Sequence, residues 1–286
     1  MKFCRKCQCF SRPGPKKGGY QQTIASGLPS DYAPAMRFSL RLGLALLAIL
    51  PLAPLRASTP PPAPPPIPLT IRYYGHAFVY LITSTGVRIA IDPYDEGTGT
   101  YVFPARLPAD VVLVTNEADD HSGSNRLFGS PQVFRSITAI GANNARGLFF
   151  KGVETYRDKE GGARLGTNAT FTFRVDGIRF AHLGGIGHVP DPDQVAEIGQ
   201  VDVLFLPIGD LALSLADLNK TAAELGAKII IPIKYKTEFT PDLALRGLDE
   251  YLAGRQNVRD LKASEFNLTP ADIPADPTIY VMSISQ

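Results

Sequence analysis

The chain has 286 residues, 44% of them hydrophobic, which is enough for one large domain or two small ones. Its formal net charge of +2 is divided unevenly, because residues 1–68 hold nine Lys/Arg and one acidic residue, whereas residues 69–286 hold 20 Lys/Arg and 26 Asp/Glu. Nucleic-acid binding needs clustered basic side chains on the folded surface, so an acidic domain argues against such a partner. All three cysteines precede residue 10 and have no fourth ligand nearby, which makes a zinc site there a weak interpretation.

Three segments are expected before the folded domain. Residues 36–58 have the pattern of an export signal, with two arginines, a short apolar stretch and then proline. The stretch is too short to span a bilayer, but its cleavage site is poorly marked, so an uncleaved membrane anchor remains an alternative. Residues 1–35 are then an upstream start-codon extension or a disordered arm, and the proline-rich residues 59–68 are an extended linker. We expect export to the periplasm or the cell exterior.

The domain, residues 69–286, opens with short apolar runs separated by turn residues. LTIRYY, AFVYLIT and VRIAID indicate an antiparallel meander, and DVVLVT at 110–115 is a continuous apolar strand that ends in a polar loop. ATFTFRV and IRFAHL flank Asp176-Gly177, which is a strong signal for a tight hairpin. VDVLFLPIG and AKIIIPIKY are the kind of apolar strand that is buried on both faces.

Helices are predicted in the second half of the domain. Ser214 marks a capping-box start and Gly226 the end of a helix that joins the last two strands. Pro241 opens another predicted helix, which runs through Leu252. Hairpins followed by strands that alternate with helices predict two sheets between helices, a four-layer αββα sandwich of the α/β class.

Four segments, in unbroken order over about residues 69–240, resemble the signature segments of metallo-β-lactamase-fold hydrolases. They are YYGHAFVYLITSTGVRIAIDPY, VTNEADDHSG, GTNATFTFRVDGIRFAHLGGIGHVPDPDQVAEIGQVDVLFLPIGD and IIIPIKYKT. The pattern is similar to the branch of L-ascorbate-6-phosphate lactonase and the metal-dependent hydrolases around it. The resemblance implies the αββα sandwich and a site where two zinc ions activate a shared water.

Most of the family's metal-ligand positions hold other residues in this chain. The positions that keep a ligand are Asp120, His121 and His182, and the substituted ones are Asn116, Ala118, Gly185 and Lys234. One implied metal site therefore keeps one of its four ligands and the other keeps two of four. Catalytic zinc normally has three protein ligands, so we expect the first site to hold no metal.

Lys234 stands where the resemblance implies the last histidine ligand. Its ammonium would repel a cation there, and without a cation it can pair with Asp120. The alternative is a solvated surface lysine. The flanking apolar residues at a strand end favour the inward position, where burial requires a paired charge.

His76, His188 and Asp158 are further candidates for the pocket. Asp158 lies in Tyr156-Arg157-Asp158, where similar proteins commonly have F-H-D. For His76 and His188 we favour a hydrogen-bonded core role over metal ligation. A single-metal site built from the retained ligands and one of these histidines stays open, and Asp92 is interpreted as structural.

Three functions follow from these residues. The leading prediction is a catalytically inactive, exported binding or scaffold module with no cofactor and with a small molecule of unspecified class as its ligand. The second is a residual hydrolase that uses one zinc or other divalent metal on a lactone, ester or phosphoester. The third is a metal-free catalyst that uses Asp120, Lys234 and His121 as acid and base. The sequence has no G-x-S-x-G, Walker A or dinucleotide-binding motif to favour other chemistry.

Overall fold

The computed structural model describes residues 67–285. The predicted N-terminal extension, the export signal and most of the proline-rich linker therefore lie outside the described residues. The first strand begins at Leu69. No helix in the described part of the chain is long and apolar enough to cross a membrane.

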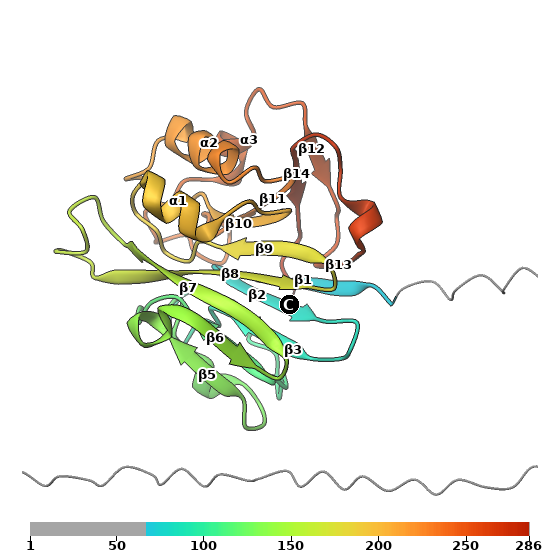
Figure 1. Cartoon of the computed structure of the whole chain (residues 1–286). Helices are drawn as coiled ribbons and strands as arrows, with labels where there is room; N and C mark the ends of the chain where they lie inside the picture. Colours follow the sequence, from blue (N-terminus) through green and yellow to red (C-terminus); the bar gives the residue numbers. More distant parts are fainter. Residues whose placement is uncertain (1–66, 286) are drawn as a thin grey trace, which may run out of the picture. The chain divides into compact units, whose positions relative to one another are not determined.

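The first sheet has six strands in the order β13-β1-β2-β3-β4-β5 (Figure 1). Its strands are β1 (Leu69–Gly75), β2 (Phe78–Ile82), β3 (Arg88–Ile91), β4 (Val111–Val114), β5 (Gln132–Arg135) and β13 (Glu265–Leu268). Strands β1 to β3 form the predicted antiparallel meander, and β4 and β5 continue parallel to β3.

The second sheet has eight strands in the order β12-β14-β11-β10-β9-β8-β7-β6. Its strands are β6 (Gly141–Ala145), β7 (Leu148–Tyr156), β8 (Thr167–Val175), β9 (Ile178–His182), β10 (Val203–Pro207), β11 (Ile229–Ile233), β12 (Val258–Asp260) and β14 (Thr278–Val281). The predicted hairpin is confirmed between β8 and β9, where Asp176 and Gly177 both have positive φ, 50° and 83°. Strands β9, β10, β11 and β14 run parallel.

The α-helices cover the eight-stranded sheet (Figure 1). They are α1 (Pro192–Ile198), α2 (Leu215–Glu224) and α3 (Leu248–Leu252), and short 3-10 turns are η1 (Ser124–Arg126), η2 (Ser136–Ala139) and η3 (Pro270–Asp272). Helix α2 begins at the predicted capping box of Ser214. The helix predicted from Pro241 is wrong over residues 241–247. There the Leu243 N–H donates to the Thr240 carbonyl (3.2 Å) in a turn, and the Arg246 N–H donates to the distant Gly209 carbonyl (2.9 Å), so the backbone bonds do not form a helical series.

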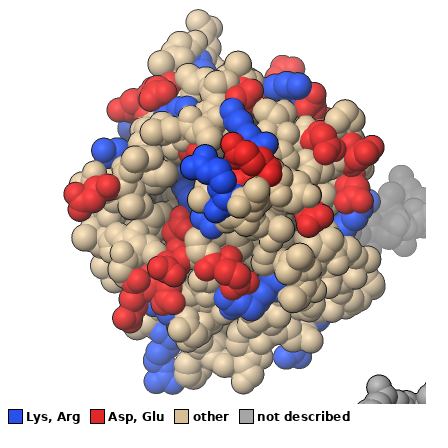
Figure 2. Space-filling view, turned by 90° about the vertical axis from the view of Figure 1, so that its left-hand side faces the viewer, with Lys and Arg blue, Asp and Glu red and all other residues tan. Residues whose placement is uncertain are grey.

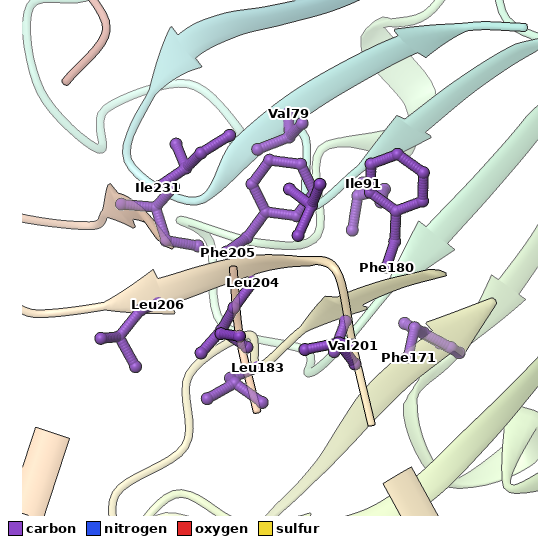
Figure 3. Packing of buried hydrophobic residues seen from close by; sticks show 14 of the residues in the cluster. Val79, Ile91, Phe171, Phe180, Leu183, Val201, Leu204, Phe205, Leu206 and Ile231 are labelled. Atoms are coloured by element: carbon purple, nitrogen blue, oxygen red, sulfur yellow. The ribbon is translucent and has the colours of Figure 1, made fainter. Parts of the chain in front are cut away.

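Alternation of side chains along the strands divides the apolar residues between two cores. Val79, Ile91, Phe180, Phe205 and Ile231 lie between the sheets (Figure 3). The outer face of the six-stranded sheet has its own core. Its members come from β1, β2, β3 and β4, from the β3–β4 loop and from the segment after η1, and they include Phe78, Tyr80, Tyr94, Tyr101 and Leu107. The predicted fold class is confirmed. The outer layer is helical over the eight-stranded sheet, whereas over the six-stranded sheet it is built from loop residues.

Charged side chains of both signs are interspersed on the face of the molecule in Figure 2. No broad area of a single charge is visible on this face. In the described chain, charges are also paired, such as Arg88 with Asp110 (2.8 Å) and Arg179 with Asp202 (2.6 Å).

Candidate functional site

The polar residues of the site follow the carboxyl ends of strands from both sheets. Asp92 directly follows β3, and Thr115 and Asn116 follow β4. His182 is the last residue of β9, and Lys234 directly follows β11. Loops after the carboxyl ends of parallel strands share one edge of a sheet, so the fold gathers residues that are far apart in the chain.

Lys234 lies between two of the retained ligand positions. Its Nζ is 2.9 Å from Asp120 Oδ2 and 2.7 Å from His121 Nε2. The Lys234 and Asp120 side chains are only 14% and 20% exposed. The predicted inward ion pair is therefore present, and the surface alternative for Lys234 is wrong.

The backbone of Lys234 is also held in place. Its φ of 50° is in the left-handed region, and its N–H donates to the His76 carbonyl at 2.6 Å. Gly209 packs directly on it, since a Cβ at that glycine would lie 2.0 Å from the Lys234 carbonyl oxygen. These contacts aim the side chain into the site.

Asp92 holds the His121 ring in position, which agrees with its predicted structural role. Its Oδ2 is 2.6 Å from His121 Nδ1, and its two oxygens also accept from the Thr115 N–H and hydroxyl, each at 2.7 Å. Because His121 Nε2 accepts from the Lys234 ammonium, the proton of the neutral ring belongs on Nδ1, which donates to Asp92. Asp92, His121, Lys234 and Asp120 thus form one continuous chain of contacts.

Asp120 is ionised in this arrangement. Burial by itself raises the pKa of this carboxyl group, but the Lys234 ammonium, through its charge and its hydrogen bond, outweighs this effect. The pKa of Asp120 therefore lies far below its usual range.

A neutral network fills the other side of the site, around Asn116. The Asn116 amide donates to Asn168 Oδ1 at 3.3 Å, and the same oxygen accepts the Gly185 N–H at 2.8 Å. Asn168 Nδ2 donates to the Thr155 hydroxyl (2.8 Å) and the Leu183 carbonyl (2.9 Å). Asn168 was not among the predicted site residues. In β8 polar residues alternate with apolar ones, and Asn168 lies in the polar register, so the sequence pattern did not indicate that this amide is buried.

His182 is buried and borders the Lys234 cluster at Asp92, whose Oδ2 is 3.7 Å from His182 Nδ1. Its Nε2 donates to the Ala77 carbonyl at 2.9 Å, and its Nδ1 accepts the Gly184 N–H at 3.1 Å. Burial lowers the pKa of His182, which favours the neutral ring. Both of its nitrogens are therefore engaged by the main chain.

The two other candidate histidines differ in how well they are bonded. His188 accepts the Tyr156 N–H at Nε2 (3.1 Å) and donates from Nδ1 to the Val189 carbonyl (2.9 Å), so its predicted hydrogen-bonded role is confirmed. His76 is fully buried and donates from Nε2 to the Thr98 carbonyl. Its Nδ1 has no hydrogen-bond partner among residues 67–285. Burial lowers the pKa of His76.

Asp158 is used by its own loop. Its carboxylate accepts four backbone N–H groups at 2.7–3.0 Å, from Glu160, Gly162, Arg164 and Leu165. The Leu165 N–H contributes most to the lowering of the pKa of Asp158; desolvation opposes it, and the three other backbone donors add to the lowering. This residue therefore organises the loop between β7 and β8.

This arrangement does not fit a divalent cation. The Nε2 lone pair of His121 is taken by Lys234, and the ring nitrogens of His182 are taken by the main chain. At Gly185, where the resemblance implies a bridging aspartate, a Cβ would lie 2.8 Å from the Asn116 amide nitrogen and 3.2 Å from His121 Nε2. Neighbouring side chains therefore leave little room for a longer residue.

Comparison with known proteins identifies the family. Residues 70–234 match the family model described as beta-lactamase superfamily domain. A UPF0173 metal-dependent hydrolase from Geobacillus thermodenitrificans is 30% identical over 198 residues, which are 59% of this chain and 86% of the relative. A UPF0173 metal-dependent hydrolase from Methanoregula boonei is 30% identical over 189 residues, 58% of this chain and 82% of that protein.

Solved structures agree with this match. A protein from Thermotoga maritima, described as a Zn-dependent hydrolase of the metallo-β-lactamase superfamily, has a TM-score of 0.62 and 30% identity, covering 76% of this chain and 100% of its own. A metal-dependent hydrolase from Parabacteroides distasonis has a TM-score of 0.53 at 18% identity over 76% of this chain and 94% of its own, and shows likeness of fold alone. The chain therefore belongs to the metallo-β-lactamase superfamily, in its family of metal-dependent hydrolases.

Proposed function

We propose that this member of the superfamily works without a two-metal centre and acts as a binding module instead of a hydrolase. The observation that carries the proposal is the position of Lys234 Nζ, 2.9 Å from Asp120 Oδ2 and 2.7 Å from His121 Nε2. The ammonium supplies the positive charge that a buried carboxylate needs. A cation at the same place would have to displace it.

The pattern of residues 36–58 supports the further proposal that this module is exported. The names of the relatives support the main alternative, a residual single-metal hydrolase of a lactone, ester or phosphoester. That function would require the Lys234 side chain to leave Asp120 and His121.

Metal analysis of the full chain, purified without chelators, tests the proposal. We expect well under one equivalent of zinc, manganese or iron. Lys234→His should bind zinc more tightly than the wild type, because it places an imidazole beside Asp120 and His121 in place of a cation. Lys236→His is the matched control, since Lys236 is exposed and two residues further along the chain.

Stoichiometric metal in the wild type would contradict the proposal. If such a preparation also hydrolysed a lactone, ester or phosphoester, and Asp120→Asn abolished that activity, the residual hydrolase would be the correct function.

A further inference from the structure

A cleft of about 280 Å³ lies next to the Lys234 cluster. It is lined by the loop after β4, the start of η2 and the loop between β7 and β8, with Asn116, Ala118, Ser136, Arg157 and Thr167 among its residues. The cleft and the cluster share a wall, because the His121 N–H donates to the Ala118 carbonyl at 2.8 Å. Its volume is just below the range of roughly 300–1,000 Å³ that is typical of ligand pockets, so its ligand is small.

The positively charged guanidinium of Arg157 lines this cleft and has no acidic partner among residues 67–285. One N–H of its guanidinium donates to the Leu165 carbonyl at 3.1 Å, and within residues 67–285 it makes no ion pair. The acidic side chain at the cleft, Glu117, is already paired with Arg135 at 2.5 Å. The Arg157 charge therefore remains unbalanced, and a ligand with one negative charge would neutralise it.

The backbone that carries Arg157 is fixed in advance. Its N–H donates to the Gly166 carbonyl at 3.1 Å, and the loop beyond it is tied to the Asp158 carboxylate. On the other side, a Cβ at Gly187 would lie 2.1 Å from the Arg157 carbonyl oxygen, so only glycine allows this approach. A preorganised loop reduces the entropy that ligand binding would otherwise cost.

We propose that this cleft binds a small monocarboxylate through the Arg157 guanidinium, with the Ser136 and Thr167 hydroxyls as further donors and without a metal. The inference rests on the proposed function, because it names the ligand class of the same site. A planar guanidinium matches a carboxylate with two parallel hydrogen bonds. A phosphate dianion would bring a second negative charge close to Glu117 with no cation to balance it.

Amide chemical-shift titration of the full ¹⁵N-labelled chain tests this, with sodium butanoate and inorganic phosphate as separate probes in the presence of EDTA. Butanoate should give saturable shifts at residues 116–118, 157 and 165–167, and phosphate should bind more weakly. Arg157→Gln should weaken butanoate binding about tenfold, and Arg157→Lys less, because lysine keeps the charge and loses the two-point geometry. Arg164→Gln is the control, an exposed arginine of the same loop outside the cleft lining.

Each other outcome has a definite meaning. Absence of saturable butanoate shifts, or equal binding by Arg157→Gln, would overturn the inference and leave the metal-free function standing. Tighter binding of phosphate would overturn the assignment to a carboxylate. Butanoate binding that appears only after zinc is added would overturn the proposed function too.

Discussion

The two sides of the site are built on different physical principles. Around Lys234, an ammonium, a carboxylate and an imidazole are in direct contact with one another. Around Asn116, buried amides, hydroxyls and main-chain groups bond to each other. The link from this network to a charged side chain runs through the Thr115 hydroxyl, which accepts from the Asn116 amide at 3.2 Å and donates to Asp92 at 2.7 Å. A carboxylate that stays at such a depth needs a cation, whereas a region without ionisable groups needs only complete hydrogen bonding.

The comparison explains why the substituted positions hold different residue types. Lys234 faces a retained acid, so it carries a charge. Asn116 faces neutral groups: its amide donates to Asn168 Oδ1 and to the Thr115 hydroxyl, and its Oδ1 accepts the Ala118 N–H, so a neutral side chain satisfies its neighbours. The Lys234 side therefore depends on charge balance and pH, whereas the Asn116 side depends mainly on complete hydrogen bonding among neutral groups.

The largest expected effect comes from breaking the charge balance. Lys234→Met should lower the free energy of unfolding by about 3 kcal/mol, because it leaves the Asp120 carboxylate buried without a partner. Adding Asp120→Asn should recover much of this loss. Denaturant titration measures both, and Lys236→Met, at an exposed lysine, should change stability by less than about 0.5 kcal/mol. An unchanged midpoint for Lys234→Met would show that the ion pair does not stabilise the domain.

Removal of the central amide tests the neutral side. Asn168→Ala should cost about 2 kcal/mol, because it leaves the Gly185 N–H and other buried groups without partners. The same denaturant titration measures the loss. Asn267→Ala is the control, since its side-chain bond to Thr70 is exposed and should contribute a few tenths of a kcal/mol. Equal effects of the two variants would contradict a buried, fully bonded network.

The pH dependence should separate the two sides. The pKa of Asp120 is lowered on folding, so its stabilising contribution is complete above the unfolded value of about 4 and is lost as the pH falls below it. The stability deficit of Asp120→Asn should therefore shrink below pH 4, by up to about 1.4 kcal/mol per pH unit. The deficit of Asn168→Ala should stay constant. Parallel pH profiles for both variants would refute the distinction.

The smallest effect is local and concerns the loop beside Arg157. Asp158→Asn should speed amide exchange at Gly162 and Leu165, because an amide side chain cannot accept all four backbone N–H groups. Hydrogen exchange read by NMR should show no change in β8. Asp193→Asn on α1, an exposed aspartate, should leave the loop amides as they are. Unaltered exchange in Asp158→Asn would mean that the loop is held by other contacts.

Much of the fold could be predicted because its signals are local. The Asp176-Gly177 turn and the Ser214 capping box each depend on a few neighbouring residues, and both are confirmed. The prediction of a helix from Pro241 failed because the Arg246 N–H finds its partner at Gly209, far away in the chain. Helix propensity depends only on neighbouring residues, so it cannot predict a bond to a distant loop.

For the site, the sequence by itself determined which residue types occupy the family's positions, and hence that Lys234 would meet Asp120. The tertiary structure alone decided how the remaining groups are used. His182 is retained as a residue, but its nitrogens are taken by the Ala77 carbonyl and the Gly184 N–H, and Asn168 matters because folding places it beside Asn116 and Gly185. The physical reason is that a buried polar group must be hydrogen-bonded, and its partners come from strands and loops that only folding brings together.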